Sequence, residues 1–291
     1  MKPFDILCGL LVPLIWGMGF MAAKPVVADF PPILLMALRF AVTALALVWF
    51  VRIPQGILRR IALVALVGSA IQYGLTFYGL RLLDASSAVL IVQLEVPFAA
   101  LLAAICIGEK LGARKIVGML IAFVGVVTIA GEPRPGNDLT GVYLVTAGAF
   151  AWAVGQVIAR TLGSVGGFTM IAWVAVFAAP QLLVASLLVE EDQIGHLMRA
   201  DAQVWATVIY LGLVMTAVGY GIWYRLLGLY PVAQVAPFLL LLPVFTVAAS
   251  VLFLGEALTW WLVGGGAVVI LGLAVVIVER PARSPRIDPR L

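Results

Sequence analysis

A succession of long apolar stretches is the feature that most constrains this chain. Ten runs of mostly apolar residues follow one another, separated by short breaks that carry charges, prolines or glycines. A helix needs about 20 apolar residues to cross the hydrocarbon core of a bilayer. Apolar residues make up 64% of the 291 residues and charged residues only 11%, against about 25% charged in a soluble domain. The sequence therefore predicts an all-α, polytopic membrane protein with ten transmembrane helices.

The ten expected spans are defined to within several residues at each edge. The continuous apolar character of the runs excludes an outer-membrane barrel, whose strands alternate over about ten residues. The connections are short, and none is long enough to hold a soluble domain. The spans are residues 5–23, 33–51, 61–80, 86–107, 114–130, 139–159, 168–189, 203–223, 233–254 and 261–278.

The distribution of basic residues predicts the orientation of these spans. If the N-terminus is cytoplasmic, thirteen Lys and Arg fall on the cytoplasmic side and four on the other, while Arg39 stays inside a span. An excess of basic residues in cytoplasmic loops is the usual rule for membrane proteins. We therefore expect a multi-pass protein of the cell inner membrane with both termini in the cytoplasm. The four residues on the other side are Lys24, Arg81, Arg134 and Arg199.

Few residues have the pattern of an enzyme or of a cofactor site. The single histidine, His196, lies in a polar loop, and Cys8 and Cys106 lie in apolar runs, where we expect free thiols. The sequence has no glycine-rich phosphate loop, and its net charge of +4 follows the topology rather than a nucleic-acid surface. We expect a protein that is not an enzyme and that uses no metal or cofactor. Its expected partners are a small solute and the lipid bilayer, and we expect it to be a monomer.

The two halves of the chain repeat one another. Because each half holds five spans, an odd number, the second copy enters the membrane from the opposite side. The sequence thus predicts two inverted five-helix repeats, at 1–130 and 139–280, and a short cytoplasmic tail at 281–291. Many secondary transporters have this architecture, with the solute site between the repeats. The matching pairs include Trp16 and Trp152, Gly19 and Gly155, Tyr78 and Tyr224, Pro97 and Pro243, Gly108-Glu109 and Gly255-Glu256, Gly118 and Gly265, and Gly125 and Gly272.

These features resemble a known family. In each half a proline is followed about a dozen residues later by Gly-Glu and then by a glycine-bearing final helix, and Leu94-Glu95-Val96-Pro97 is similar to a frequent Glu-Pro segment. The chain resembles the EamA-type exporters of the drug/metabolite transporter superfamily, and its aromatic-rich spans are most similar to exporters of aromatic and other neutral amino acids. The resemblance implies export through a central cavity lined by helices 1, 3, 4, 6, 8 and 9. Export of drugs or nucleotide-linked sugars is the alternative within the same superfamily, and an intramembrane enzyme is the alternative outside it.

Polar and aromatic side chains on several spans share helix faces and suggest where such a cavity lies. Residues three and four positions apart lie on one face of a helix. Aromatic walls combined with amide or hydroxyl groups suit an organic solute with a polar head and an apolar body. The alternative is hydrogen bonding between helices without solute contact. The expected solute-binding residues are Trp16, Gln72, Tyr73, Thr76, Glu95, Trp152, Gln156, Tyr220, Trp223, Gln234 and Phe238.

Glu95 and Arg39 are the acid and the base that lie deep inside spans. A charge at the centre of a bilayer is costly, so such residues usually have a function or a partner. Glu95 either holds a substrate amine, exchanges a proton that couples export to proton entry, or forms an ion pair with Arg39. The second repeat has Leu241 at the position of Glu95, which allows an asymmetric role for this acid.

Prolines and two acidic residues mark further positions of the repeat. Pro97 and Pro243 are expected to kink their helices in mid-span and to serve as hinges for alternating access, because proline removes a backbone donor. Glu109 and Glu256 follow helix ends, and we expect them to cap the helices that begin next, where a negative charge is favourable.

Overall fold

The computed structural model describes all residues except 109–111, 133–138, 164, 231 and 278–291. Within this described part the chain is helical and contains no strands. Ten of its helical stretches are long and apolar enough to cross a membrane, and they match the expected spans in order. The prediction of a ten-helix, all-α membrane protein is therefore confirmed. The stretches are Pro3–Asp29, Pro32–Phe50, Leu58–Leu82, Ala85–Cys106, Ala113–Ala130, Thr140–Arg160, Gly167–Val189, Ala202–Leu229, Ala236–Leu254 and Trp260–Ile277.

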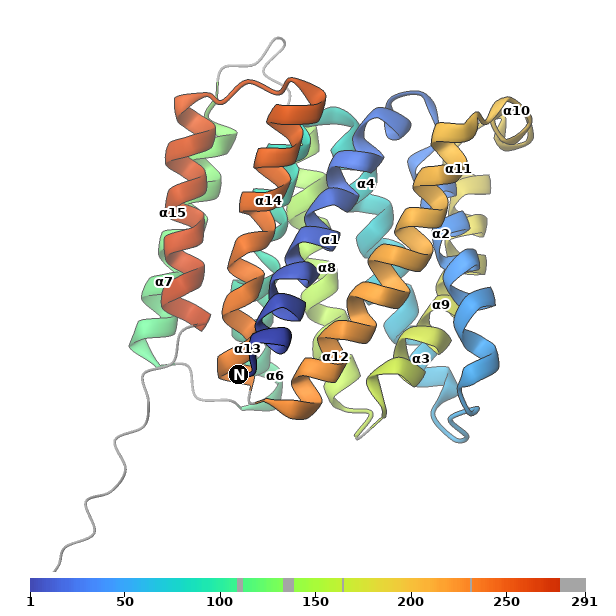
Figure 1. The fold of residues 1–291 in the computed structure, drawn as a ribbon, viewed down its shortest axis with the longest axis horizontal. Coiled ribbons are helices and arrows are strands. Elements are labelled where there is room, and N and C mark those ends of the chain that lie inside the picture. Colours follow the sequence, from blue (N-terminus) through green and yellow to red (C-terminus); the bar gives the residue numbers. More distant parts are fainter. Residues whose placement is uncertain (109–111, 133–138, 164, 231, 278–291) are drawn as a thin grey trace, which may run out of the picture.

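The first half of the chain forms five spans that run up and down the bundle (Figure 1). The third span is built from three helical segments, α3, η2 and α4, and the fourth from α5 and α6. The elements are α1 (Pro3–Asp29), α2 (Pro32–Leu47), η1 (Val48–Phe50), α3 (Leu58–Ala65), η2 (Leu66–Ile71), α4 (Gln72–Leu82), α5 (Ala85–Val92), α6 (Glu95–Ile107) and α7 (Ala113–Ala130).

The second half repeats this plan and adds one short helix, α10, within the polar stretch that was expected to be a loop. Its eighth span is built from α11, η4 and α12. The elements are α8 (Thr140–Arg160), α9 (Gly167–Val189), α10 (Gln193–Arg199), α11 (Ala202–Ile209), η4 (Tyr210–Val218), α12 (Gly219–Leu229), α13 (Val232–Val235), η5 (Ala236–Leu240), α14 (Leu241–Ala249), η6 (Ser250–Leu254) and α15 (Trp260–Ile277). We call the end of the bundle where α1 begins the N face, which lies at the bottom in Figure 1, and the other end the opposite face.

Irregular backbone recurs at equivalent places in the two halves. The third and eighth spans each contain a π-helical segment, η2 and η4, which are uncommon in proteins and frequent at functional sites. The fourth and ninth spans each restart near the middle, at Glu95 and Leu241, which are the first residues of α6 and α14. The repeat seen in the sequence is thus also a repeat of backbone geometry.

Each of the two prolines follows a break in its span. Pro97 and Pro243 are each the third residue of a helix, α6 and α14, rather than residues in the interior of a continuous helix. The first turn of a helix has amide groups without intrahelical partners, so proline loses no helical hydrogen bond there. A proline disturbs a helix at the carbonyl four residues before it, so a break just before each proline agrees with the expected interruption in mid-span. The role of the prolines as hinges stays a prediction.

Glycines allow the last spans of the two repeats, α7 and α15, to pack closely in antiparallel directions (Figure 1). A Cβ atom at Gly118 would lie 2.8 Å from the carbonyl oxygen of Gly272, and one at Gly265 would lie 2.8 Å from that of Gly125. Small residues let helix backbones approach in membranes, where packing rather than the hydrophobic effect drives association. The glycines that recur in the two halves therefore face one another across this contact.

Two glutamates cap helices at the opposite face. The Glu256 carboxylate accepts hydrogen bonds from the amides of Ala85 at 2.7 Å and Ser86 at 3.0 Å, at the start of α5. The Glu190 carboxylate accepts from the amides of Ile33 at 2.8 Å and Leu34 at 3.0 Å, in the first turn of α2. Glu256 was expected to cap the helix that follows it and instead caps one 171 positions away, because the fold brings that start beside it. Glu109 lies outside the described residues.

Candidate functional site

A cavity of about 130 Å³ lies inside the bundle and is enclosed by the second, third, sixth, seventh and eighth spans. It combines aromatic side chains with hydroxyl, amide and guanidinium groups. The lining residues are Arg39 and Phe40 of α2, Val64, Gly68, Ser69 and Tyr73 of the third span, Trp152, Gln156 and Ala159 of α8, Met170, Ile171 and Val174 of α9, and Thr216, Tyr220 and Tyr224 of the eighth span.

The cavity extends from the middle of the bundle toward the N face. Arg39 lies halfway along α2 and marks the inner end of the cavity. Ala159 lies in the last turn of α8 and Met170 in the first turn of α9, and both turns are at the N face. The cavity therefore spans the half of the bundle next to the N face.

Aromatic rings close the bundle on the other side of Arg39. The ring of Tyr73 lies 5.3 Å from that of Phe40 and 5.9 Å from that of Phe77, which in turn lies 5.9 Å from that of Phe20. Phe77 is 0% exposed and Phe20 is 6% exposed. This packed layer separates the cavity from the opposite face.

The side chain of Arg39 is completely buried and is held by neutral groups. Its Nε and Nη2 donate hydrogen bonds to Thr216 Oγ1 at 3.2 and 3.0 Å, and Nη2 also donates to the Tyr73 hydroxyl at 3.4 Å. The guanidinium carbon lies 4.5 Å from the centre of the Tyr73 ring, a distance typical of a cation–π contact. Arg39, considered in the sequence only as a partner of Glu95, is thus a wall residue of the cavity.

Glu95 does not pair with Arg39. The half-buried Glu95 side chain makes no ion pair or hydrogen bond with any other residue that the structure describes. It lies within electrostatic range of Tyr220, which is also within range of Arg39. The ion pair that was one of the three explanations for Glu95 is therefore absent from this conformation.

Four of the expected solute-binding residues line the cavity, namely Tyr73, Trp152, Gln156 and Tyr220. They come from the third, sixth and eighth spans, on which the sequence showed shared polar and aromatic faces. Gly68 and Gly155 bring two of these spans into direct backbone contact beside the cavity. Aromatic and polar residues at helical spacing therefore indicated part of the cavity lining.

Other expected residues lie elsewhere. Gln72 and Thr76 are buried against α8, hydrogen-bonded to each other at 3.3 Å, and do not belong to the lining of the cavity. The Trp16 indole donates to the carbonyl oxygen of Met215 at 3.0 Å, and its ring lies 4.8 Å from Tyr220, behind the wall of the cavity. The remaining three also lie away from the lining: Trp223 packs on Trp16, Gln234 is exposed, and Phe238 packs on Gly9.

The sequence did not indicate the contribution of α2 and α9. The first, fourth and ninth spans were expected to line the cavity. In the structure the second span, with α2, and the seventh span, which is α9, do so instead. Met170, Ile171 and Val174 of α9 are apolar, and in the sequence they cannot be told from residues that face lipid. Thr216 and Tyr224, also in the lining, lie on the eighth span, whose polar and aromatic face was recognised.

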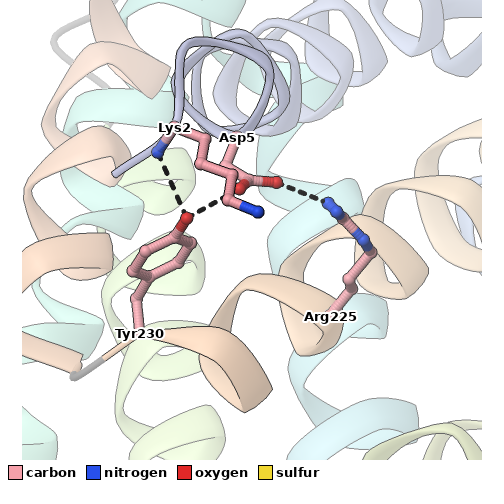
Figure 2. Close-up of polar contacts among 4 residues, drawn as sticks. All are labelled: Lys2, Asp5, Arg225 and Tyr230. Atoms are coloured by element: carbon pink, nitrogen blue, oxygen red, sulfur yellow. Dashed lines mark hydrogen bonds and ion pairs between the residues drawn. The ribbon is translucent and has the colours of Figure 1, made fainter.

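A polar cluster joins the two halves at the N face (Figure 2). Asp5, in the first turn of α1, is 3% exposed and forms an ion pair with Arg225 of α12, with 2.9 Å between Oδ1 and Nη1. The Tyr230 hydroxyl donates to Asp5 Oδ2 at 2.7 Å and accepts from the Lys2 backbone amide at 3.2 Å. The cluster thus ties the start of the first span to the end of the eighth.

The fold and the cavity define a class of protein, a multi-pass membrane transporter built from two inverted five-helix repeats. Comparison with family models identifies the family, because the EamA-like transporter family matches at residues 4–131 and again at 139–278. The chain belongs to this family, within the drug/metabolite transporter superfamily, and is a small-molecule exporter rather than an enzyme.

Several relatives are similar over most of the chain. A probable amino-acid metabolite efflux pump of Escherichia coli is 31% identical, over 93% of this chain and 94% of the relative. A probable terminal-alkyne amino-acid exporter of Streptantibioticus cattleyicolor is 26% identical, over 75% of this chain and 73% of that one. A solved structure titled only as that of a protein matches with a TM-score of 0.64 at 20% identity, and covers 95% of this chain and 99% of that chain. This last likeness concerns the fold alone.

Proposed function

We propose that the protein exports neutral amino acids, aromatic ones among them, or similar small metabolites across the inner membrane by alternating access. The observation that carries this proposal is the central cavity, which joins aromatic walls to hydroxyl, amide and guanidinium groups. Such a lining suits a solute with an ionic or polar head and an apolar body. Relatives named as an amino-acid metabolite efflux pump and an amino-acid exporter support the same class of solute.

The size of the cavity favours small solutes. Its volume of about 130 Å³ is well below the roughly 300 Å³ at which pockets for drug-sized ligands begin. A nucleotide-linked sugar is larger still. The volume therefore supports amino acids over the drugs and nucleotide-linked sugars that other members of the superfamily carry.

The charge distribution supports an orientation in which the N face is cytoplasmic. Thirteen basic residues then lie on the cytoplasmic side and four on the other. In this orientation the cavity reaches toward the cytoplasm, where an exporter collects its solute. Export then requires the contacts at the opposite face to separate, with the two repeats, 1–130 and 139–280, moving as units of a monomer around the restarted helices at Pro97 and Pro243.

The cavity residues divide into walls and polar contacts. Trp152 and Tyr220 supply aromatic surface for the apolar body of the solute, and Gln156 and Tyr73 supply hydrogen-bonding groups. Trp16 supports Tyr220 from behind. Glu95 does not belong to the lining of the cavity and has no partner in the described part of the chain, and it either holds the solute's ammonium group after a change of conformation or exchanges a proton.

Uptake of labelled amino acids into proteoliposomes tests the proposal. Trp152→Ala is expected to reduce transport of L-phenylalanine by roughly tenfold, since it removes stacking and wall area, and to affect L-alanine less. Trp205→Ala is the matched control, because Trp205 is 42% exposed on α11 and lies outside the cavity. Equal transport by the wild type and by folded Trp152→Ala would place the site elsewhere.

A pH gradient separates the two roles of Glu95. If Glu95 exchanges a proton, Glu95→Gln abolishes the stimulation of transport by the gradient and leaves exchange of solute at equal pH. If Glu95 holds the ammonium group, the same variant raises KM for amino acids with or without a gradient. Unchanged transport under both conditions would exclude both roles.

A further inference from the structure

Arg39 is a permanently charged side chain whose charge has no acidic partner. It is 0% exposed, and no Asp or Glu of the described chain lies within ion-pair distance of its guanidinium. Its hydrogen bonds go to the hydroxyls of Thr216 and Tyr73, both neutral, and its Nη1 has only the sulfur of Met36 beside it at 3.8 Å. Among the residues that the structure describes, the guanidinium therefore has no counter-charge, and its Nη1 has no oxygen acceptor.

A buried guanidinium in this state is poised for an anion. Arginine stays protonated in proteins and offers five N–H donors in a rigid plane. Removing its charge from water is unfavourable unless an opposite charge and further hydrogen bonds compensate. The aromatic ring of Tyr73 and the Thr216 hydroxyl offset part of this cost. Because Arg39 belongs to the cavity wall but is 0% exposed, an anion in the cavity lies next to the guanidinium and reaches it when neighbouring lining side chains move aside.

The surroundings hold the guanidinium in one orientation. Thr216 Oγ1 donates its own hydrogen to the carbonyl oxygen of Leu211 at 2.8 Å, so its lone pairs are directed to Arg39 Nε and Nη2. Thr216 lies in the π-helical segment η4, and Arg39 belongs to the other repeat. The two repeats together thus position the guanidinium, and Thr216 and Tyr73 act as positioning residues.

We propose that Arg39 binds the carboxylate of the transported solute, so that the exporter selects solutes with a free carboxylate group. This inference rests on the proposed function. Arginine binds carboxylates through paired, charge-assisted hydrogen bonds, which are stronger than neutral ones and specific in direction. The carboxylate then lies at the inner end of the cavity, with the solute's apolar body between the aromatic walls nearer the N face.

Direct binding to the purified full-length protein in detergent tests this assignment. The probes are L-leucine and L-phenylalanine, each compared with its amide, which keeps the size and the ammonium group and loses the negative charge. We expect the amides to bind on the order of 100-fold more weakly than the acids, because an amide leaves the buried guanidinium without a counter-charge. Chloride is titrated separately, to distinguish an inorganic anion from the carboxylate of a solute.

In each variant, the quantity measured is the ratio of the affinity for the acid to the affinity for its amide. Arg39→Gln is expected to bring this ratio close to one, and Arg39→Lys to keep part of the preference because the charge remains without the fork. Thr216→Val keeps the shape of residue 216 and is expected to weaken the acids by roughly tenfold while leaving the amides unchanged. The Thr216→Val variant still tests the assignment if Arg39→Gln does not fold. Arg60→Gln, an exposed arginine on α3, is the matched control and should leave the ratio unchanged.

Each outcome decides between the two proposals. Equal binding of acid and amide by the wild type would overturn the Arg39 assignment and leave the proposed export function standing. Equal loss of acid and amide binding in Thr216→Val would make Arg39 a structural residue. If chloride binds as tightly as either amino acid, and this binding depends on Arg39, the anion bound by Arg39 is inorganic. Failure of both amino acids and both amides to bind would count against the export function and against this assignment with it.

Discussion

The two ends of the bundle are held together by different chemistry. At the opposite face, Glu190 and Glu256 of the second repeat each accept two backbone hydrogen bonds at the start of a helix of the first repeat, α2 and α5. At the N face, Asp5 of the first repeat meets the side chains of Arg225 and Tyr230 of the second. Both ends therefore join the halves, one through backbone amides and the other through side chains.

The difference agrees with the position of the cavity. A carboxylate on the first amides of a helix is favoured by the hydrogen bonds and by the helix dipole, so each glutamate fixes a whole helix end rather than one side chain. Those contacts lie on the side where the aromatic layer closes the bundle. The Asp5 cluster belongs to α1 and the residue before it and to α12 and the residue after it, and none of its four residues is among those that line the cavity.

The largest effect is expected at the crossing between the two ends. Gly155 of α8 and Gly68 of η2 touch through their backbones, and a Cβ at Gly155 would overlap the Cα of Gly68. Gly155→Val must therefore push the two spans apart, which is expected to lower the free energy of unfolding by about 3 kcal/mol or more. A melting curve in detergent measures this. Gly264→Val is the control, since among the described residues nothing lies within 4 Å of a Cβ there; equal melting temperatures for the two variants would contradict the contact.

Loss of a glutamate cap comes next. Glu256→Gln keeps one acceptor oxygen but turns an NH2 group toward a backbone amide, so we expect the free energy of unfolding to fall by about 2 kcal/mol. If the cap also keeps the opposite face closed, and its whole loss of about 2 kcal/mol acts on that equilibrium, the population open at that face rises by roughly thirtyfold, because 1.4 kcal/mol corresponds to a factor of ten. Labelling of a cysteine placed at Ala88, which is 0% exposed on α5 and lies outside the aromatic layer, measures the open population.

Glu191, an acid at the same face that caps no helix among the described residues, provides the control for Glu256→Gln. Glu191 is exposed, and it lies one residue after the cap residue Glu190. Glu191→Gln removes the same charge and is expected to change neither the melting temperature nor the labelling. A loss of stability in Glu191→Gln as large as that in Glu256→Gln would attribute the effect to net charge rather than to the cap.

The sequence predicted those features that depend on a local pattern or on a pattern that occurs in both halves of the chain. The ten spans follow from hydropathy alone, and the glycines of α7 and α15 were visible because each occurs twice at the same spacing. Tyr73, Trp152 and Tyr220 were found as site residues because aromatic and polar side chains at helical spacing share a face. Local patterns thus identified three of the five spans that line the cavity.

Long-range partners explain what the sequence missed. Arg39 meets Thr216, which is 177 positions away, and Glu256 meets Ala85, which is 171 positions away. No local pattern indicates such pairs.

A smaller effect is expected from the N-face cluster. Asp5→Ala removes the acceptor of the Tyr230 hydroxyl and the partner of Arg225, but the Arg225 side chain is 47% exposed and is solvated in the variant. We therefore expect a smaller fall in melting temperature than for Glu256→Gln. Asp5→Asn keeps one oxygen for Tyr230 and should lie between Asp5→Ala and the wild type. A larger fall for Asp5→Ala than for Glu256→Gln would reverse the comparison of the two ends.

The smallest expected effect concerns how the local stability of α10, at the opposite face, depends on pH. Arg199 Nη2 lies 2.6 Å from Asp192 Oδ2, and this hydrogen bond lowers the pKa of the Asp192 carboxyl below its usual value. A carboxyl with a lowered pKa stabilises the folded helix above its unfolded pKa, and this contribution disappears as the pH falls through the folded value. Because both side chains are more than half exposed, the effect on local opening should be roughly fivefold or less. Hydrogen exchange of residues 193–199, corrected for intrinsic rates, should show protection that is higher at pH 6 than at pH 2.5, and Arg199→Ala should remove most of this difference. A difference that persists in Arg199→Ala would contradict the role of the Asp192–Arg199 pair.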